Sequence, residues 1–575
     1  MKLHVRPVLD RFREQLASVE AAPQLALLGL LAGLVTGFVV LLFRASVEGI
    51  LEAINGSQAE AFENLEPLWR LALPIIGAVL IGLYLWKQSA ADRRMGIAHV
   101  LERFSHHQGY FNLRSLINQF NLGVMTLGSG FSVGREGPAV HLGAAASSLI
   151  GQWMRLPNNS MRTLVGCGAA AAIAASFNTP LAGVIFAIEI ILLDFSLASL
   201  LPLTLAAVTG ALMSQLVYGS GSVINVPPLA LGSLWEVPWL VVCGMALGGL
   251  GAMFSWCLLF CQRWARGPFF LRLIGIGVLT GAVGWFLPQA MGMGYDSLNA
   301  ALIGQLSLGV LLALALVKTL LTATSIGLGL PAGLISPILV CGACLGGALG
   351  LIGQELFGLR SPSGLYAMLG MAAAMGAILQ APLAALIALL ELTHNPNIVF
   401  PGMLVVAIAN LTTSQVLGQG SVFLQSLRQQ GIGIRFSPQV QAMQAVGAST
   451  LMERDFICLP RHVELAQAKD LFAKRLPRWI IVERDDKPVA LLRAADLASQ
   501  LELEHNAPLD LLSMPGERRD LCMLPMQATV QEALDALSNQ GHEVLCLMVR
   551  RRRSAPRPAG VVTREALDHY YQLNR

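Results

Sequence analysis

The sequence has 575 residues, of which 54% are hydrophobic and only 13% charged, and its mean hydropathy is +0.61. This composition excludes an ordinary soluble enzyme and predicts a protein embedded in a lipid bilayer. The formal net charge of +4 is small against 39 basic and 35 acidic residues, which excludes an extended basic surface for nucleic acid.

Charged residues are distributed unevenly along the chain. Residues 441–575 hold 36 of the 74, and residues 1–440 hold the other 38. We therefore expect a cytoplasmic N-terminal segment at 1–22, a membrane domain at 23–440 and a soluble cytoplasmic region at 441–575.

The apolar segments of the membrane part are of two kinds. The run Gln24–Phe43 is long enough to cross a bilayer as one helix, which takes ~20 residues. It follows a basic segment without a signal cleavage site, so we expect a multi-pass cell-membrane protein with both termini cytoplasmic. Later runs, such as Pro180–Leu193 and Pro337–Leu351, are shorter and predict half-helices that meet inside the membrane at a solute site.

An internal repeat supports the prediction of a transport site. Gly168–Ile190 can be laid on Gly370–Leu392 at a constant offset of 202 residues, which places Glu189 on Glu391. Such duplication is typical of secondary transporters and related channels. The two copies are expected at about residues 70–218 and 238–420.

The C-terminal region contains a second repeat, at an offset of 65 residues, in which Phe456–Pro460 matches Leu521–Pro525. Each copy has the pattern of a strand, an amphipathic helix and apolar strands, which indicates an α+β fold. This order resembles a pair of CBS modules, expected at about residues 450–505 and 512–575.

The segment Gly134–Pro138 holds Arg135 and Glu136, two charges in a long uncharged stretch and just before an expected helix. Charges inside a membrane are costly and indicate function. A helix N-terminus presents unpaired N–H groups and a partial positive charge, which suits an anion. Gly333–Pro337 supplies the same arrangement in the second repeat, so two helix N-termini are expected to converge on an anion site.

These segments resemble the CLC family of chloride channels and chloride/proton antiporters. Its G-[KR]-E-G-P signature corresponds to Gly134–Pro138, its G-I-F-x-P segment to Gly333–Pro337, and further agreement comes from Asn178–Gly183 followed by Glu189. The resemblance implies an all-α polytopic membrane fold of inverted repeats with many short or broken helices, a homodimer with one anion pathway per subunit, and a gating role for Glu136.

The resemblance also implies which residues bind the anion, and two of them depart from the family pattern. The residues expected to line the pathway are Arg135, Gly137, Leu334, Ile335, Met95, Gly96 and Phe423. Met95 stands where the family usually has a Ser, and Phe423 near the position of a Tyr. Because each hydrogen bond to an anion contributes roughly 1.5–3 kcal/mol, we expect weaker central chloride binding than in the family pattern.

A third departure concerns protons. The internal proton-transfer Glu of many antiporters corresponds to Ile190, which favours a voltage-gated-type chloride channel over tight exchange. A loosely coupled chloride/proton antiporter, or a transporter of fluoride or nitrate, is the alternative. Glu189 and Glu391 are expected to pair with backbone or Arg at helix ends, with a role in the proton path as the other interpretation.

No metal site or resident cofactor is expected. Adenine nucleotide could bind the CBS pair through Thr563 and Asp496, but each copy of the G-x-x-T-x-x-D motif is incomplete, so a scaffold that stabilises the dimer is an equal alternative. An intramembrane serine protease built on Ser129 is disfavoured because neither His141 nor His394 shows a partnering pattern. The expected ligands are chloride and protons.

Overall fold

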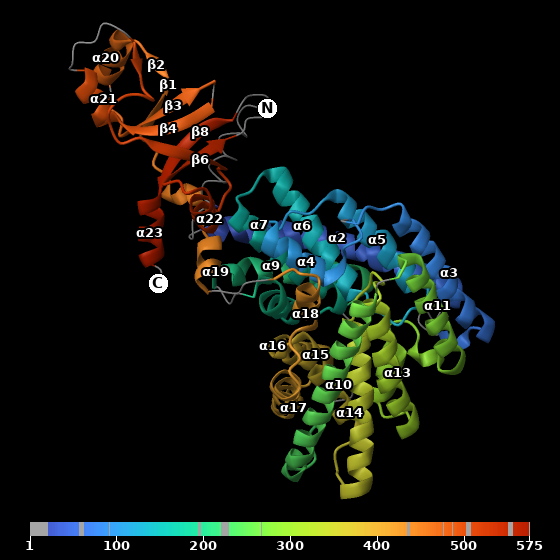
Figure 1. Cartoon of the computed structure of the whole chain (residues 1–575). Helices are drawn as coiled ribbons and strands as arrows, with labels where there is room; N and C mark the ends of the chain where they lie inside the picture. The colour runs from blue at the N-terminus through green and yellow to red at the C-terminus, as the bar shows by residue number, and fades with distance from the viewer. Residues whose placement is uncertain are drawn as a thin grey trace. The chain divides into compact units, whose positions relative to one another are not determined.

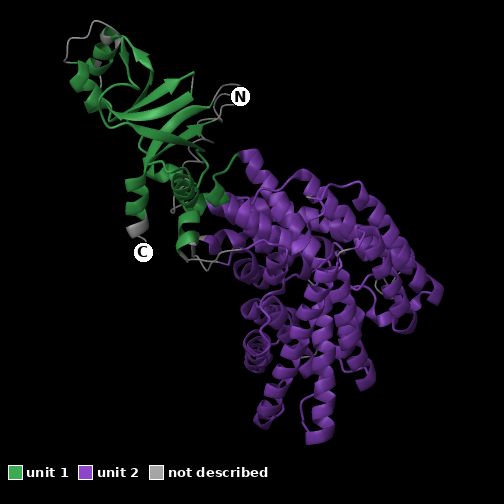
Figure 2. Cartoon of the chain, viewed as in Figure 1, with its two compact units in different colours: residues 1–24, 155–160, 436–575 green, residues 25–154, 161–435 purple. Residues whose placement is uncertain are grey.

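The computed structural model describes residues 16, 21–56, 62–90, 92–193, 197–219, 229–265, 267–433, 438–474, 476–485, 487–501, 508–549 and 556–573. The chain forms two compact units (Figure 2): unit 1 contains residues 1–24, 155–160 and 436–575, and unit 2 contains residues 25–154 and 161–435. Most of the expected N-terminal segment 1–22 lies outside the described residues.

Long apolar helices dominate the chain before residue 436 (Figure 1). Nine helices among the described residues are long and apolar enough to cross a membrane. The helices are α2 (Ala22–Asn55), α3 (Pro67–Trp86), α4 (Gly96–His106), α5 (Leu113–Gly128), α6 (Glu136–Met154), α7 (Asn158–Phe177), α8 (Pro180–Phe186), α9 (Leu197–Tyr218), α10 (Val237–Trp264), α11 (Phe269–Phe286), α12 (Tyr295–Leu302), α13 (Leu308–Gly327), α14 (Ile335–Phe357), α15 (Ser363–Leu379), α16 (Pro382–Thr393), α17 (Val399–Leu411) and α18 (Val422–Gln429).

Short irregular helices connect or extend these elements. They are η1 (Phe62–Asn64), η2 (Ala187–Leu192), η3 (Leu234–Glu236), η4 (Pro288–Ala290), η5 (Pro396–Ile398) and η6 (Thr412–Val416), of which η2 and η6 are π-helical. Helices α10, α13 and α14 pack side by side, as do α3 and α11 (Figure 1).

Glycine contacts repeat in the two halves of the membrane part. A Cβ at Gly168 in α7 would lie 2.2 Å from the carbonyl oxygen of Gly143 in α6. A Cβ at Gly370 in α15 would likewise lie 2.2 Å from the carbonyl oxygen of Gly342 in α14. Only glycine allows backbones to approach so closely, and the two crossings occupy matching places in the sequence repeat.

The expectation of short half-helices is confirmed for one segment and wrong for another. Helix α8 ends after seven residues and continues as the π-helix η2, so the segment from Pro180 is short and irregular. Helix α14, in contrast, is continuous over 23 residues. Its glycines do not end it because they serve packing instead: a Cβ at Gly346 would lie 2.1 Å from the carbonyl oxygen of Tyr366.

The C-terminal region is an α+β structure around one six-stranded sheet. The strand order is β1-β3-β4-β6-β7-β8, and β2 pairs separately with β5. The strands are β1 (Phe456–Pro460), β2 (His462–Val463), β3 (Trp479–Arg484), β4 (Lys487–Arg493), β5 (Leu509–Asp510), β6 (Arg519–Pro525), β7 (Val544–Val549) and β8 (Arg557–Thr563). The helices are α19 (Pro438–Gln444), η7 (Ala448–Leu451), α20 (Leu465–Lys474), α21 (Ala494–Leu501), α22 (Val530–Gln540) and α23 (Arg564–Leu573).

The repeat of 65 residues appears as two equivalent halves of this sheet. Parallel β1 and β3 pair Phe456 with Trp479, and parallel β6 and β7 pair Leu521 with Val544 at the same offset. In each half the third strand is antiparallel to the second. Strands such as β3 and β7 are buried on both faces over most of their length, so they consist mainly of consecutive apolar residues. The apolar runs in the sequence indicate these strands correctly.

Candidate anion site

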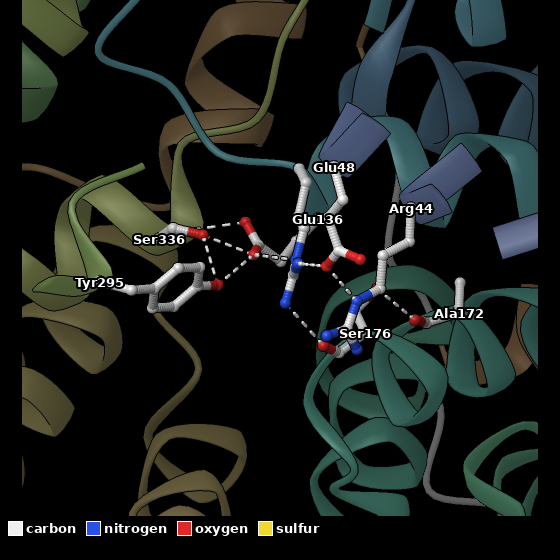
Figure 3. Close-up of polar contacts among 8 residues, drawn as sticks. Arg44, Glu48, Glu136, Ala172, Ser176, Tyr295 and Ser336 are labelled. Atoms are coloured by element: carbon white, nitrogen blue, oxygen red, sulfur yellow. Dashed lines mark hydrogen bonds and ion pairs between the residues drawn. The ribbon is translucent and has the colours of Figure 1, made fainter. Parts of the chain in front are cut away.

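Glu136 is the first residue of α6, and its carboxylate is completely buried. Oε1 accepts hydrogen bonds from the hydroxyl of Tyr295 at 2.9 Å and from the hydroxyl of Ser336 at 2.5 Å, and Oε2 accepts one from the backbone N–H of Ser336 at 3.2 Å (Figure 3). Ser336 lies in the first turn of α14, where N–H groups have no acceptor within the helix. The carboxylate thus occupies the positive end of a helix from the opposite repeat.

The two motif segments are held together through their backbones. Gly134 and Gly333 form an isolated antiparallel bridge, with N–H to O distances of 2.8 Å and 2.9 Å. A Cβ at Gly137 would lie 2.6 Å from the Cα of Gly333, so neither position accommodates a side chain. The predicted convergence of the N-termini of α6 and α14 is therefore present in the structure.

Arg135 is buried and connects Glu136 to a second carboxylate. Its Nη1 lies 3.7 Å from Oε1 of Glu48, its Nε lies 4.0 Å from Oε1 of Glu136, and its Nη2 donates to the carbonyl of Ser176 at 3.1 Å. Glu48, on α2, also accepts a hydrogen bond of 2.6 Å from Nε of Arg44 (Figure 3). The Glu48 side chain is 26% exposed, so this network leads from Glu136 towards the surface of unit 2.

Tyr295 is positioned by the segment that precedes it. Gly294 has a positive φ of 88° and caps the N-terminus of helix α12, whose first residue is Tyr295. The completely buried ammonium group of Lys318 donates to the carbonyls of Ala290 and Gly292, both at 3.0 Å. These bonds satisfy N–H groups of the Lys318 ammonium and fix the chain that presents the Tyr295 hydroxyl to Glu136.

The remaining residues predicted to line the pathway lie at three helix starts. Leu334 and Ile335 are buried at the N-terminus of α14. Met95 precedes α4 in an extended conformation, and a Cβ at Gly96 would lie 3.9 Å from the carbonyl oxygen of Ala332, next to the α14 motif. Phe423 is buried at the start of α18, a helix that packs against α4.

Glu189 and Glu391 bind helix starts in opposite repeats. The carboxylate of Glu189, in η2, accepts hydrogen bonds from the N–H groups of Leu383 and Ala384 in the first turn of α16. Glu391, in α16, accepts equivalent bonds from the first turn of α8. Ile190, beside Glu189, is buried and apolar. These bonds satisfy N–H groups that a helix start leaves unpaired.

Thr563 and Asp496 make local contacts in the C-terminal region. The Thr563 hydroxyl accepts a hydrogen bond of 3.3 Å from the N–H of Ala566 in the first turn of α23. The Asp496 carboxylate accepts one of 3.3 Å from the N–H of Glu517. Their assignment to a nucleotide stays a prediction.

Four residues of the site network were not identified from the sequence. Arg44 and Glu48 are an i, i+4 pair near the end of an apolar helix of 34 residues, and the rule that singled out Arg135 and Glu136 also applies to them. The same rule applies to Lys318, the only charged residue of α13. Tyr295 gave no local signal, because only the tertiary structure brings it to the site.

The fold and the site define a multi-pass membrane protein that transports anions. The family model described as "Voltage gated chloride channel" matches residues 77–414. A putative chloride channel protein ClcB-like from Ralstonia nicotianae is 33% identical over 374 residues, which are 63% of this chain and 86% of the relative. The H(+)/Cl(-) exchange transporter ClcA of Klebsiella pneumoniae is 30% identical over 435 residues, which are 72% of this chain and 89% of the relative.

Two solved structures share the fold. That of a slow cyanobacterial Cl-/H+ antiporter gives a TM-score of 0.64 at 23% identity and covers 71% of this chain and 97% of its own. That of a eukaryotic CLC transporter gives 0.60 at 18% identity and covers 94% of this chain and 97% of its own. The chain belongs to the CLC family of chloride channels and transporters, which are not enzymes. The predicted fold class is confirmed: a helical CLC fold followed by an α/β region.

Proposed function

We propose that the protein exchanges chloride for protons across its membrane, with Glu136 as the group that both ligands share. The observation that carries the proposal is the buried Glu136 carboxylate bound at the N-terminus of α14. An anion that binds this helix start competes with the carboxylate for the same positively polarised N-terminus. A displaced carboxylate loses those bonds in a buried environment, where a bare charge is costly, so its displacement favours uptake of a proton.

This proposal replaces the passive channel that the apolar Ile190 favours. The ClcA relative and the cyanobacterial structure are exchangers, and the ClcB-like relative is described as a putative channel. The coupling argument above depends on Glu136 and its donors, and it needs no ionisable group at position 190.

We assign the anion to the N–H groups of Leu334 and Ile335, to the segment Arg135–Gly137, and to the residues before and at the start of α4. Met95 and Phe423 line this route without a side-chain donor, which supports weak central binding.

For the molecule as a whole we propose a homodimer with one pathway in each subunit and with cytoplasmic termini. The C-terminal region is proposed to be a pair of CBS modules, at about residues 450–505 and 512–575. The two equivalent halves of its sheet support that assignment. It would serve as a scaffold, or bind adenine nucleotide through Thr563 and Asp496.

The test is flux from proteoliposomes with simultaneous chloride and pH recording. A chloride gradient should drive protons against their own gradient, and Glu136→Gln should abolish proton movement while chloride still flows. Chloride flux without any proton movement in the unmodified protein would show a channel. Chloride flux and proton flux that are both indifferent to Glu136→Gln would exclude the assignment of Glu136.

A further inference from the structure

A cluster of buried titratable side chains lies beside the anion route and outside the network of Glu136. His141, on α6, is completely buried, and His99, on α4, is 4% exposed. Their imidazole rings stack, with centroids 5.3 Å apart and planes inclined by 24°. His141 follows Glu136 by five residues on the same helix, which is roughly 7.5 Å along its axis.

The hydrogen bonds of His141 determine its tautomer and leave one nitrogen able to take a proton. Nδ1 accepts from the N–H of Gly96 at 3.1 Å, so Nε2 carries the hydrogen and donates to the hydroxyl of Ser115 at 2.9 Å. The N–H of Gly96 also donates to Oε1 of Gln119 at 2.8 Å. Because Gly96 keeps this second acceptor, protonation of Nδ1 does not leave its N–H unpaired.

His99 connects this ring to the surface of unit 2. Its Nδ1 lies 3.2 Å from Oε2 of Glu102, and the other oxygen of that carboxylate accepts a hydrogen bond from Arg94. The side chain of Glu102 is 10% exposed and that of Arg94 is 48% exposed. Arg94, Glu102, His99 and His141 thus form a polar path from solvent to the backbone of Gly96.

Burial disfavours the charged form of both rings. Glu102 favours a proton on His99 and Arg94 opposes it, and Arg103 opposes a proton on either ring. Phe111 packs edge-on against both rings, and the side chains that α5 contributes, Ser115 and Gln119, are uncharged. A proton on either ring is therefore held weakly, and a group that passes a proton on in each cycle must release it readily.

We propose that His99 and His141 form the internal binding site for the transported proton. A proton enters from Glu102, binds His99, passes to Nδ1 of His141 when one ring rotates, and is released into the anion route at Gly96, from which Glu136 takes it up. Each imidazole returns to its neutral form, so one proton moves and no other bond changes. This inference rests on the proposed exchange. It supplies the proton-carrying group that is missing at the apolar Ile190.

The experiment compares His99→Gln and His141→Gln with His106→Gln in proteoliposomes that report chloride and proton flux together. His106 is an exposed residue of the same helix α4 and serves as the matched control. Since proton transfer by a positioned side chain contributes typically 100-fold or more, proton flux should fall by about that factor in the two variants, with chloride flux retained. The control should keep the unmodified ratio of protons to chloride.

The alternative outcomes each decide the question. An unchanged ratio in both His99→Gln and His141→Gln would overturn the inference and leave the exchange proposal intact. An equal loss of chloride and proton flux in both variants would show a structural role and would also overturn it. If the unmodified protein moves chloride without protons, the exchange proposal itself fails, and the relay fails with it.

Discussion

At the scale of single residues, the donors around Glu136 control how readily chloride replaces its carboxylate. Tyr295→Phe removes a hydrogen bond to a charged group, which is worth roughly 1.5–3 kcal/mol, so chloride should compete about tenfold better or more. The measurement is the chloride concentration that gives half-maximal flux. Tyr84→Phe, which removes a hydroxyl bonded to Asn118, is the control. A half-maximal concentration that does not change would contradict the competition between carboxylate and chloride.

The lack of a side-chain donor at Met95 leads to a second prediction at this scale. Met95→Ser introduces a hydroxyl at the start of α4 and should tighten chloride binding by about tenfold or more, measured by calorimetry on the purified protein. Phe423→Tyr tests the second expected position in the same way. Tight and selective binding in the unmodified protein would contradict the prediction of a weak central site.

At the scale of the elements, the two repeats stabilise each other through paired carboxylates. Glu189→Ala and Glu391→Ala each remove two hydrogen bonds at a helix start. Because bonds to a charged group contribute roughly 1.5–3 kcal/mol each, both variants should unfold several degrees below the unmodified protein in detergent. The two losses should be similar, since the contacts are equivalent. A normal melting temperature combined with lost proton coupling in Glu189→Ala would instead support a role in the proton path.

At the scale of the whole molecule, the contacts of Glu136 among the described residues all come from one chain. Tyr295, Ser336 and Arg135 all approach Glu136 from this chain, and Glu48 of the same chain contacts Arg135. In mixtures of unmodified and Glu136→Gln subunits, proton flux should therefore fall in direct proportion to the fraction of variant chains. A fall with the square of the unmodified fraction would show that two chains must cooperate in one pathway.

The sequence by itself determined the membrane location, the duplication and the Gly134–Pro138 and Gly333–Pro337 motifs. These properties follow from local composition and spacing: a span needs a long apolar run, and a helix start needs glycine and proline at particular positions. The internal repeat relates the two motifs, and the structure confirms that they meet. The length of α14 was predicted wrongly, since glycines that break a helix and glycines that pack one look alike in sequence.

Only the tertiary structure decided which side chains surround Glu136 and where the stacked histidines lie. Glu48, Tyr295 and Ser336 come from three distant segments, and His99 meets His141 only because α4 packs against α6. Hydrogen bonds and ring contacts depend on distances of a few ångströms between elements, and no periodicity in one segment encodes them. The helix ends that attract an anion and the carboxylate of Glu136 were therefore predictable. The side chains that hold Glu136 in place, and the histidines proposed to carry the proton, were not.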